Sequence, residues 1–200
     1  MNLSIIIPTI GRDTLHHTLT TLLPQMLLGD EVLIVGDGPQ AEAQKILLAF
    51  RKDGNRAGGD IFPGTYWETE STRDMGATQR DAAIVAAKGS HLMFIDDDDS
   101  YNPWALRVVR TAITQAPTTA HIFKMARYKT SWTTNHYDLV LWNESILKCG
   151  QIGTPMFVVP NTPPIPRWTE LNPQHHDFDF ILQYADNVEF HPEIIARIRS

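Results

Sequence analysis

Residues 91–99 read His91-Leu92-Met93-Phe94-Ile95-Asp96-Asp97-Asp98-Asp99, an apolar run that ends in four consecutive aspartates. The run from His91 to Ile95 predicts a strand that is buried on both faces, as in a parallel sheet. Two earlier runs of the same kind are Leu3 to Ile7 and Glu31 to Val35, each followed by a loop. The fold class follows from what lies between these three runs.

Helical patterns fill the intervals between the predicted strands. After the first strand, apolar residues recur at helical spacing: Leu15, Leu19, Leu22, Leu23 and Met26. The other expected helices are Gln40 to Phe50, Met75 to Ala87 with Gly89 as its cap, and a helix that starts at Asn102-Pro103 and ends at Gln115. Asp53 to Gly64 is expected to be a loop. This alternation predicts an α/β fold with a mostly parallel central sheet and helices on both faces.

The second half of the chain has a less regular pattern. Strands are predicted at Ala120–Met125, Leu139–Trp142 and Met156–Val159, and a short helix at Asp177–Tyr184. The proline-rich stretch from Pro160 to Pro173 cannot be a regular helix, and a long loop of this kind usually has a function. No repeat or linker divides the sequence, so residues 1–200 are expected to form a single domain.

The composition narrows the function classes. The 200 residues are 42% hydrophobic and 20% charged, as in a globular domain, and the net charge of −6 argues against a general binder of polyanions. The single cysteine, Cys149, cannot form an internal disulfide, which favours a reducing compartment. No apolar run approaches the roughly 18 residues of a membrane helix. We therefore expect a cytoplasmic protein without integral membrane association.

The aspartate run lies at the edge of the predicted sheet where ligands bind. In open α/β sheets this edge lies beyond the carboxyl ends of the strands, so the loops at Pro8-Thr9 and Gly36–Pro39 belong to it as well. Like charges this close repel one another, and a bound cation relieves the repulsion. Carboxylate oxygens suit Mg²⁺ or Mn²⁺, which commonly bridge carboxylates to a diphosphate. The alternative is a solvated acidic turn that caps the next helix.

Five segments, in this order, give the chain a resemblance to family 2 glycosyltransferases. They are Ser4–Thr9, the helix pattern from Leu15 to Gln25, Val35–Gly38, Arg80–Gly89 and Phe94–Pro103. The resemblance covers about Leu3 to Gln115. It implies a GT-A domain with a Rossmann-like sheet, in which residues 1–115 bind the nucleotide-sugar and the less regular residues 116–200 hold the acceptor and the catalytic base.

The resemblance also implies roles for residues of the nucleotide half. Pro8 and Thr9 would line the nucleotide pocket, and Asp37 would accept a hydrogen bond from the base, expected to be uracil. Arg80 would approach the diphosphate or the aspartates. The alternative for Arg80 is an ordinary ion pair with a neighbouring carboxylate, Asp74 or Asp81.

The aspartates would form the Asp-x-Asp motif of the family. Asp98 is the expected direct ligand of Mn²⁺ or Mg²⁺, and Asp96 is the second metal residue. Asp96 or Asp97 would lie near the ribose of the nucleotide-sugar.

The family places its catalytic base on an aspartate that opens a late helix. Asp177 matches this position best, and Asp179 is the second choice. The carboxylate would take the proton of the acceptor hydroxyl as it attacks the anomeric carbon with inversion, while the metal stabilises the departing diphosphate. Three histidines of this half are left out of the metal set: His175, His176 and His191.

Three tryptophans of the second half, Trp132, Trp142 and Trp168, are candidates for stacking on a sugar. Trp168 is the preferred one, because the proline-rich loop around it precedes Asp177 and could fold over the site as a lid.

Together these features predict a metal-dependent hexosyltransferase that uses a UDP-sugar. The acceptor stays open between a glycan, a lipid-linked sugar, a protein side chain and a modified nucleobase, and a homo-oligomer stays open as well. One alternative is a non-catalytic protein that binds a nucleotide-sugar or glycan. Another is a nucleotidyltransferase. Such an enzyme would normally have a glycine-rich phosphate loop directly after the first strand, where this chain has a single glycine, Gly11, between Pro8 and Arg12. A dinucleotide-binding oxidoreductase is disfavoured because Pro39 lies in the turn that would carry its fingerprint.

Overall fold

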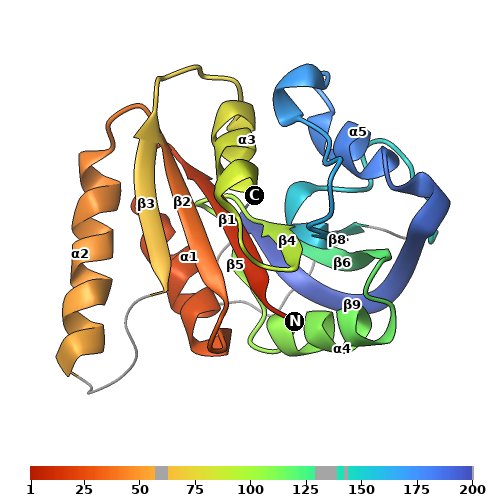
Figure 1. Cartoon of the computed structure of the whole chain (residues 1–200), viewed down its shortest axis with the longest axis horizontal. Helices are drawn as coiled ribbons and strands as arrows, with labels where there is room; N and C mark the ends of the chain where they lie inside the picture. The colour runs from red at the N-terminus through yellow and green to blue at the C-terminus, as the bar shows by residue number, and fades with distance from the viewer. Residues whose placement is uncertain (57–62, 129–138, 142–143, 200) are drawn as a thin grey trace.

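The computed structural model describes residues 1–56, 63–128, 139–141 and 144–199 (Figure 1). The strands are β1 (Leu3–Thr9), β2 (Glu31–Asp37), β3 (Gly64–Thr69), β4 (His91–Phe94), β5 (Ser100–Tyr101), β6 (Ala120–Tyr128), β7 (Leu139–Leu141), β8 (Phe157–Pro160) and β9 (Val188–Arg199). The helices are α1 (Leu15–Leu22), α2 (Ala41–Arg56), α3 (Ala77–Ala86), α4 (Ala105–Gln115) and α5 (His176–Leu182). Short 3₁₀ segments are η1 (Leu23–Gln25), η2 (Thr154–Met156), η3 (Trp168–Glu170) and η4 (Ala185–Asn187).

All these strands belong to one sheet with the order β3-β2-β1-β4-β8-β6-β9-β5, and β7 pairs with β6. The first four strands in this order are parallel to one another. β8 is antiparallel to both β4 and β6, and the long β9 is parallel to β6 but antiparallel to β5. β1, β2, β3, β4, β6 and β9 therefore run in one direction, which confirms the expected mostly parallel sheet of an α/β fold.

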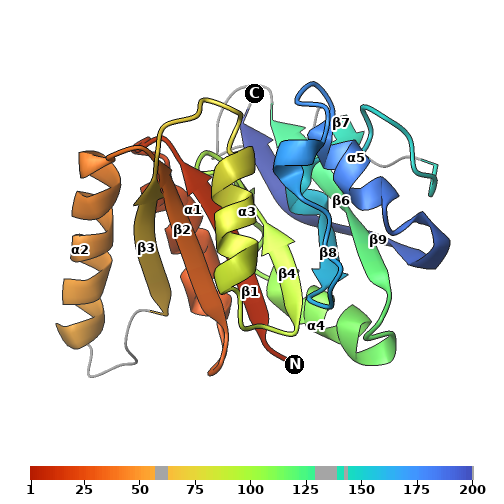
Figure 2. The same ribbon diagram turned by 45° about the horizontal axis from the view of Figure 1, so that its top comes forward.

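The parallel part of the sheet is buried because its central strands are apolar on both faces. Every residue of β1 and of β4 is buried. Helix α3 covers one face, and α1 lies on the other face behind β2 (Figures 1 and 2). Leu15, Leu19 and Leu22 are fully buried, so the predicted apolar face of α1 is the face that packs on the sheet.

Several expected boundaries were wrong. The stretch Asp53 to Gly64 is not a loop throughout, because α2 continues to Arg56 and β3 begins at Gly64; residues 57–62 lie outside the described part. The strand β3 escaped prediction because it is a half-exposed edge strand without an apolar run. The strands β5 and β9 escaped as well: β5 is very short, and polar residues and a proline interrupt β9.

Two expected helix caps have other roles. Helix α3 ends at Ala86, and the residue after it, Ala87, is already extended. Gly89 instead allows a close approach to β1, since a Cβ atom there would lie 2.5 Å from the backbone nitrogen of Ser4. Asn102 does not cap α4, which begins at Ala105; its side-chain amide donates to the carbonyl of Ile194 on β9 at 2.6 Å. The surroundings of Gly89 and of Asn102 both depend on strands far away in the sequence.

None of the helices in the described part of the chain is long and apolar enough to cross a bilayer.

Candidate active site

The carboxyl ends of four parallel strands meet at one edge of the sheet. In the strand register, Thr9 lies beside Gly36, Asp37 beside Thr69, and Ile6 beside Phe94, just before the aspartates. A cavity of about 650 Å³ opens at this edge, a size suited to a small-molecule ligand. Its lining residues are Pro8, Thr9, Ile10, Arg12, Asp37, Gln40, Ser71, Arg73, Met75, Gly76, Gln79, Asp96 and Asp97.

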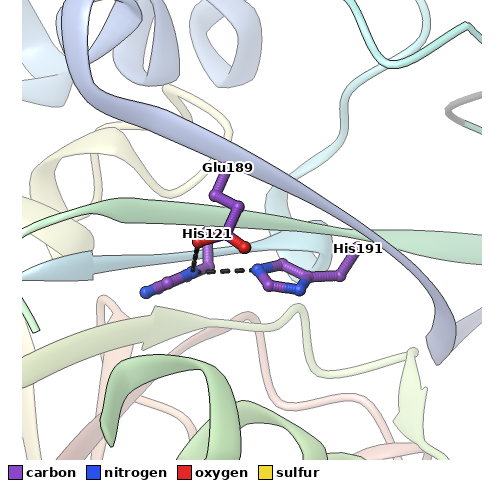
Figure 3. A group of neighbouring side chains, drawn as sticks. All are labelled: His121, Glu189 and His191. Carbon is purple, nitrogen blue, oxygen red and sulfur yellow. Dashed lines mark hydrogen bonds and ion pairs between the residues drawn. The ribbon is translucent and has the colours of Figure 1, made fainter. Parts of the chain in front are cut away.

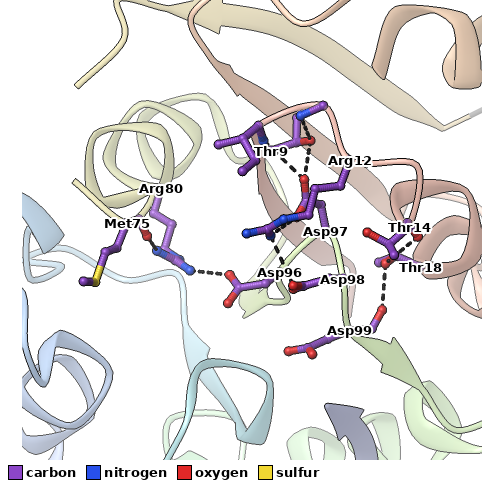
Figure 4. A network of polar contacts seen from close by, with 12 residues as sticks. Thr9, Arg12, Thr14, Thr18, Met75, Arg80, Asp96, Asp97, Asp98 and Asp99 are labelled. Carbon is purple, nitrogen blue, oxygen red and sulfur yellow. Dashed lines mark hydrogen bonds and ion pairs between the residues drawn. The ribbon is translucent and has the colours of Figure 1, made fainter. Parts of the chain in front are cut away.

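Asp97 ties the aspartate run to the loop that follows β1. One of its carboxylate oxygens accepts from the hydroxyl of Thr9 at 2.6 Å and from the backbone amide of Ile10 at 3.2 Å. The other oxygen accepts from the guanidinium of Arg12 at 2.6 Å (Figure 4). Asp97 is almost fully buried, and protein groups use both of its oxygens. Its described contacts are therefore structural.

Asp96 faces the cavity and is held by a buried arginine. The Arg80 guanidinium donates to Asp96 Oδ1 at 2.5 Å and to the carbonyl of Met75 at 2.7 Å (Figure 4). The same guanidinium lies over the ring of Trp168, 4.7 Å from its centroid. The alternative for Arg80, an ion pair with Asp74 or Asp81, was wrong.

Asp96 lies in a strongly acidic neighbourhood. Burial raises the pKa of its carboxyl, and although Arg80 opposes this rise, the nearby carboxylates of Asp177, Asp98 and Asp97 add to it. The side chain nevertheless keeps 40% exposure, so water in the cavity reaches it. An added positive charge would lower the energy of this cluster.

Asp98 is the most accessible carboxylate beside Asp96. Its side chain is 33% exposed, and one oxygen lies 3.3 Å from the guanidinium of Arg12. Arg12, which sequence reasoning missed as a site residue, therefore forms ion pairs with both Asp97 and Asp98 (Figure 4). Asp96 and Asp98 both offer oxygen atoms, the ligand type that Mg²⁺ and Mn²⁺ prefer, so this pair fits the predicted ion.

Asp37 lies in the cavity wall, but its carboxylate already has protein partners. The backbone amides of Thr72 and Arg73 donate to it at 2.7 and 3.1 Å, and the amide of Gln79 donates at 3.2 Å. Asp37 thus fixes the loop between β3 and α3 against the end of β2. Its predicted contact with a base stays a prediction.

The loop between β3 and α3 has a strained backbone that sequence reasoning did not detect. Arg73 and Met75 have φ values of 54° and 58°, which side-chain-bearing residues rarely adopt. Gly76 follows with φ of 82°, and a Cβ there would lie 2.8 Å from Cβ of Pro8. Gly76 lets the loop close against Pro8. It is the one feature of the sequence that could have indicated this part of the cavity wall.

Asp177, the predicted base, lies near the aspartates at the start of α5. Its Oδ1 is buried without a well-aligned hydrogen-bond partner, and His176 Nε2 lies 3.2 Å from it. Burial favours a higher pKa for Asp177, but His176, Arg80 and Thr154 outweigh burial and lower it. The carboxylate is therefore ionised at neutral pH, as a proton acceptor must be.

Asp179, the second choice, is engaged elsewhere on the same helix. Its carboxylate lies 2.9 Å from Nδ1 of His175, one turn earlier. The third histidine left out of the metal set, His191, lies on β9 beside His121, near the amino end of β6.

Trp168 is not a sugar-stacking residue, contrary to expectation. It is 1% exposed and packs in an aromatic cluster with Phe94, Phe157 and Phe180. The segment around it is fixed to α3 through Asp81, which accepts from the backbone amides of Trp168 and Thr169 at 2.7 and 3.2 Å. Because the segment at Trp168 is anchored to α3, it does not form the movable lid that was expected there. Trp132 and Trp142 lie outside the described residues.

Comparison with known proteins now identifies the family. A model of the family described as "Glycosyl transferase family 2" matches residues 4–163. The chain belongs to this family. Its segment from β1 to the proline-rich stretch, including the aspartate run, is the part that the family model matches.

Solved structures of the GT-A fold resemble the whole chain. A crystal structure of S. aureus TarS superposes with a TM-score of 0.74 at 15% identity, over 100% of this chain and 37% of that one. TarS residues 1–349 in complex with UDP-GlcNAc give a TM-score of 0.71 at 15% identity, over 100% of this chain and 59% of that one. At this identity the likeness shows the fold alone. The chain spans less than two thirds of these structures, and a search of curated proteins found no match.

Proposed function

We propose that the chain is a glycosyltransferase that moves a sugar from a UDP-sugar to an acceptor hydroxyl with inversion. The observation that carries the proposal is the cavity at the carboxyl edge of β1, β2 and β4, which is lined by Asp96, with the carboxylates of Asp98 and Asp177 close enough to raise the pKa of Asp96. Membership of family 2 supports the reaction class. The TarS structures, solved with UDP and with UDP-GlcNAc, support the choice of UDP.

The cavity walls suggest where the donor lies. The nucleotide would lie between Pro8, Thr9 and Gly76, with Asp37 and Gln79 at the end of the cavity toward β2. Mn²⁺ or Mg²⁺, held by Asp98 and Asp96, would supply positive charge to the departing diphosphate. A hexose then lies toward Asp177.

The chain's own residues prepare the proton transfer. Arg80 holds Asp96 in place and lowers the pKa of Asp177 by its charge. One oxygen of the Asp177 carboxylate, whose side chain is 30% exposed, would accept the proton of the acceptor hydroxyl. His176, whose ring packs edge-on against Trp168, fixes the start of α5 and thereby the position of this oxygen.

Calorimetric titration of UDP with and without Mn²⁺ tests the proposal, with GDP and NAD as controls. We expect UDP to bind only in the presence of the ion. Asp98→Asn should abolish this ion-dependent binding of UDP. Absence of binding by any nucleoside diphosphate with any divalent ion would overturn the proposal. Binding of UDP without release of UDP from UDP-sugars would instead favour the non-catalytic binding protein.

A further inference from the structure

A second group of metal-ligating side chains lies away from the aspartates. His121 on β6 and Glu189 and His191 on β9 each offer one ligand atom, and these three atoms lie within 4.8 Å of one another (Figure 3). His121 lies beside Val158 of β8, whose neighbour Val159 pairs with Leu92 at the start of β4. The group therefore lies toward the amino ends of the parallel strands, whereas the donor cavity lies at their carboxyl ends.

The strand register brings the three side chains to one face. Glu189 is paired directly with His121, and His191 follows two positions later on β9. The register of β6 and β9 shifts just beyond this point, between Ile122 and Lys124, and such irregularities re-aim side chains. His191 is further fixed by stacking on Phe123, with ring centroids 4.6 Å apart.

The distances are close to those of a tetrahedral zinc site. His121 Nδ1 lies 2.9 Å from His191 Nε2 and 3.9 Å from Glu189 Oε2. Ligands about 2.0–2.1 Å from a tetrahedral Zn²⁺ lie about 3.3 Å from one another. Small side-chain rotations would therefore bring all three atoms to one ion.

The buried histidine is already oriented as a metal ligand. His121 Nε2 lies 2.9 Å from the carbonyl oxygen of Ala116. Because a carbonyl only accepts, Nε2 must carry the proton and donate, which leaves the Nδ1 lone pair facing His191 and Glu189. Metal-bound histidines almost always donate their other ring nitrogen to such an acceptor. His121 is fully buried, whereas the Glu189 side chain is 51% exposed, so an ion here keeps one side open to water.

We propose that His121, Glu189 and His191 form a binding site for Zn²⁺ or a similar transition-metal ion, separate from the donor cavity. Imidazole nitrogens favour Zn²⁺, Co²⁺ or Ni²⁺ over Mg²⁺ and Mn²⁺, which the aspartates suit better. The two sites therefore select different ions. An ion here joins β9 to β6 through side chains, beside the point where their register shifts.

Titration of the tag-free full chain with Zn²⁺, and with Co²⁺ followed by its visible absorption, tests the site. We expect one saturable equivalent per chain. Loss of a partner that only orients a ligand typically costs about 10–100-fold in affinity, so Glu189→Gln and His191→Gln should each weaken binding by at least about tenfold. Glu189→Gln alters a half-exposed side chain, so its folding is not at risk.

Matched controls separate this site from others. His175→Gln changes a histidine that also has a carboxylate partner, and Asp98→Asn changes the aspartate cluster; both should leave Zn²⁺ affinity unchanged. Glu189→Gln should leave Mn²⁺-dependent UDP binding unchanged, so failure of either proposal is seen separately. The proposal is overturned if no saturable Zn²⁺ binding occurs, if Glu189→Gln and His191→Gln both bind like the parent chain, or if Asp98→Asn removes the binding.

Discussion

Consecutive aspartates 96–99 have different environments although they are identical in type. Both carboxylate oxygens of Asp97 accept hydrogen bonds from the loop after β1, while Asp96 forms an ion pair with Arg80. Asp98 keeps an exposed carboxylate, and the carbonyl of Asp99 accepts from the hydroxyl of Thr18 at 2.7 Å. Alternate members of the run, Asp96 and Asp98, are thus the pair left to meet a ligand.

Replacing the predicted base tests its role directly. Asp177→Asn should reduce the transfer rate by about 10²–10⁴-fold, because the amide cannot accept the proton, while UDP affinity stays unchanged. The rate is measured as UDP release in the presence of acceptor. Asp179→Asn, one turn away and paired with His175, is the matched control and should retain most of the activity. A reversed result would move the base to Asp179.

The residues of the site were predictable to the extent that they follow strands. Pro8, Asp37 and Asp96 lie in the cavity wall as expected, because each directly ends or follows a buried apolar run. The contacts of Asp37 and the position of Arg12 were not predictable. They depend on loop conformations that come from long-range packing, such as that of Gly76 against Pro8.

At the level of elements, α3 carries Arg80 and lies against the cavity, so its start must be fixed. Asp74 does this from outside the helix: its Oδ2 accepts from the backbone amide of Thr78 at 3.0 Å and from its hydroxyl at 2.6 Å. These bonds act on one of the free amides of the first turn.

Asp74→Ala should lower the free energy of unfolding by about 1 kcal/mol at pH 7. Burial alone would raise the pKa of Asp74, but the hydrogen bonds from Thr78 lower it overall below 3.8. Because the folded pKa is depressed, this stabilisation is present above pH 3.8 and is lost as the pH falls through the folded pKa. Urea unfolding at pH 7 and pH 3 checks this, with the exposed Asp13→Ala as control. An equal loss at both pH values would contradict it.

Elements with an apolar period were predictable, and elements defined by pairing were not. β1, β2 and β4 are central strands whose runs are apolar on both faces, so their sequences suffice. β3 is an edge strand, and β9 is held along most of its length by β6 rather than by its own pattern. Such strands satisfy their backbone through partners that a single sequence does not reveal.

For the whole molecule, binding of the donor should appear as added stability. At a UDP concentration about 100 times Kd with Mn²⁺ present, the gain is about 2.7 kcal/mol, or about 5–10 °C in Tm for a chain of this size. Thermal unfolding followed by circular dichroism measures this shift. GDP and Asp98→Asn provide the controls, and an equal shift with Asp98→Asn would contradict the placement of the ion.

The pairing of β5 with β9 has a consequence for how the chain is made. The aspartate run is suspended between β4 and β5, and Ser100 and Tyr101 of β5 pair only with Arg197 and Ala196 among the described strands. During synthesis, almost a hundred residues must be translated after the aspartates before Ala196 and Arg197, the partners of β5, exist. Contacts between such distant segments form late, and they reduce the folding rate. The nascent chain therefore carries the aspartate run without the pairing of β5 until β9 emerges, so this part of the sheet is completed late in folding.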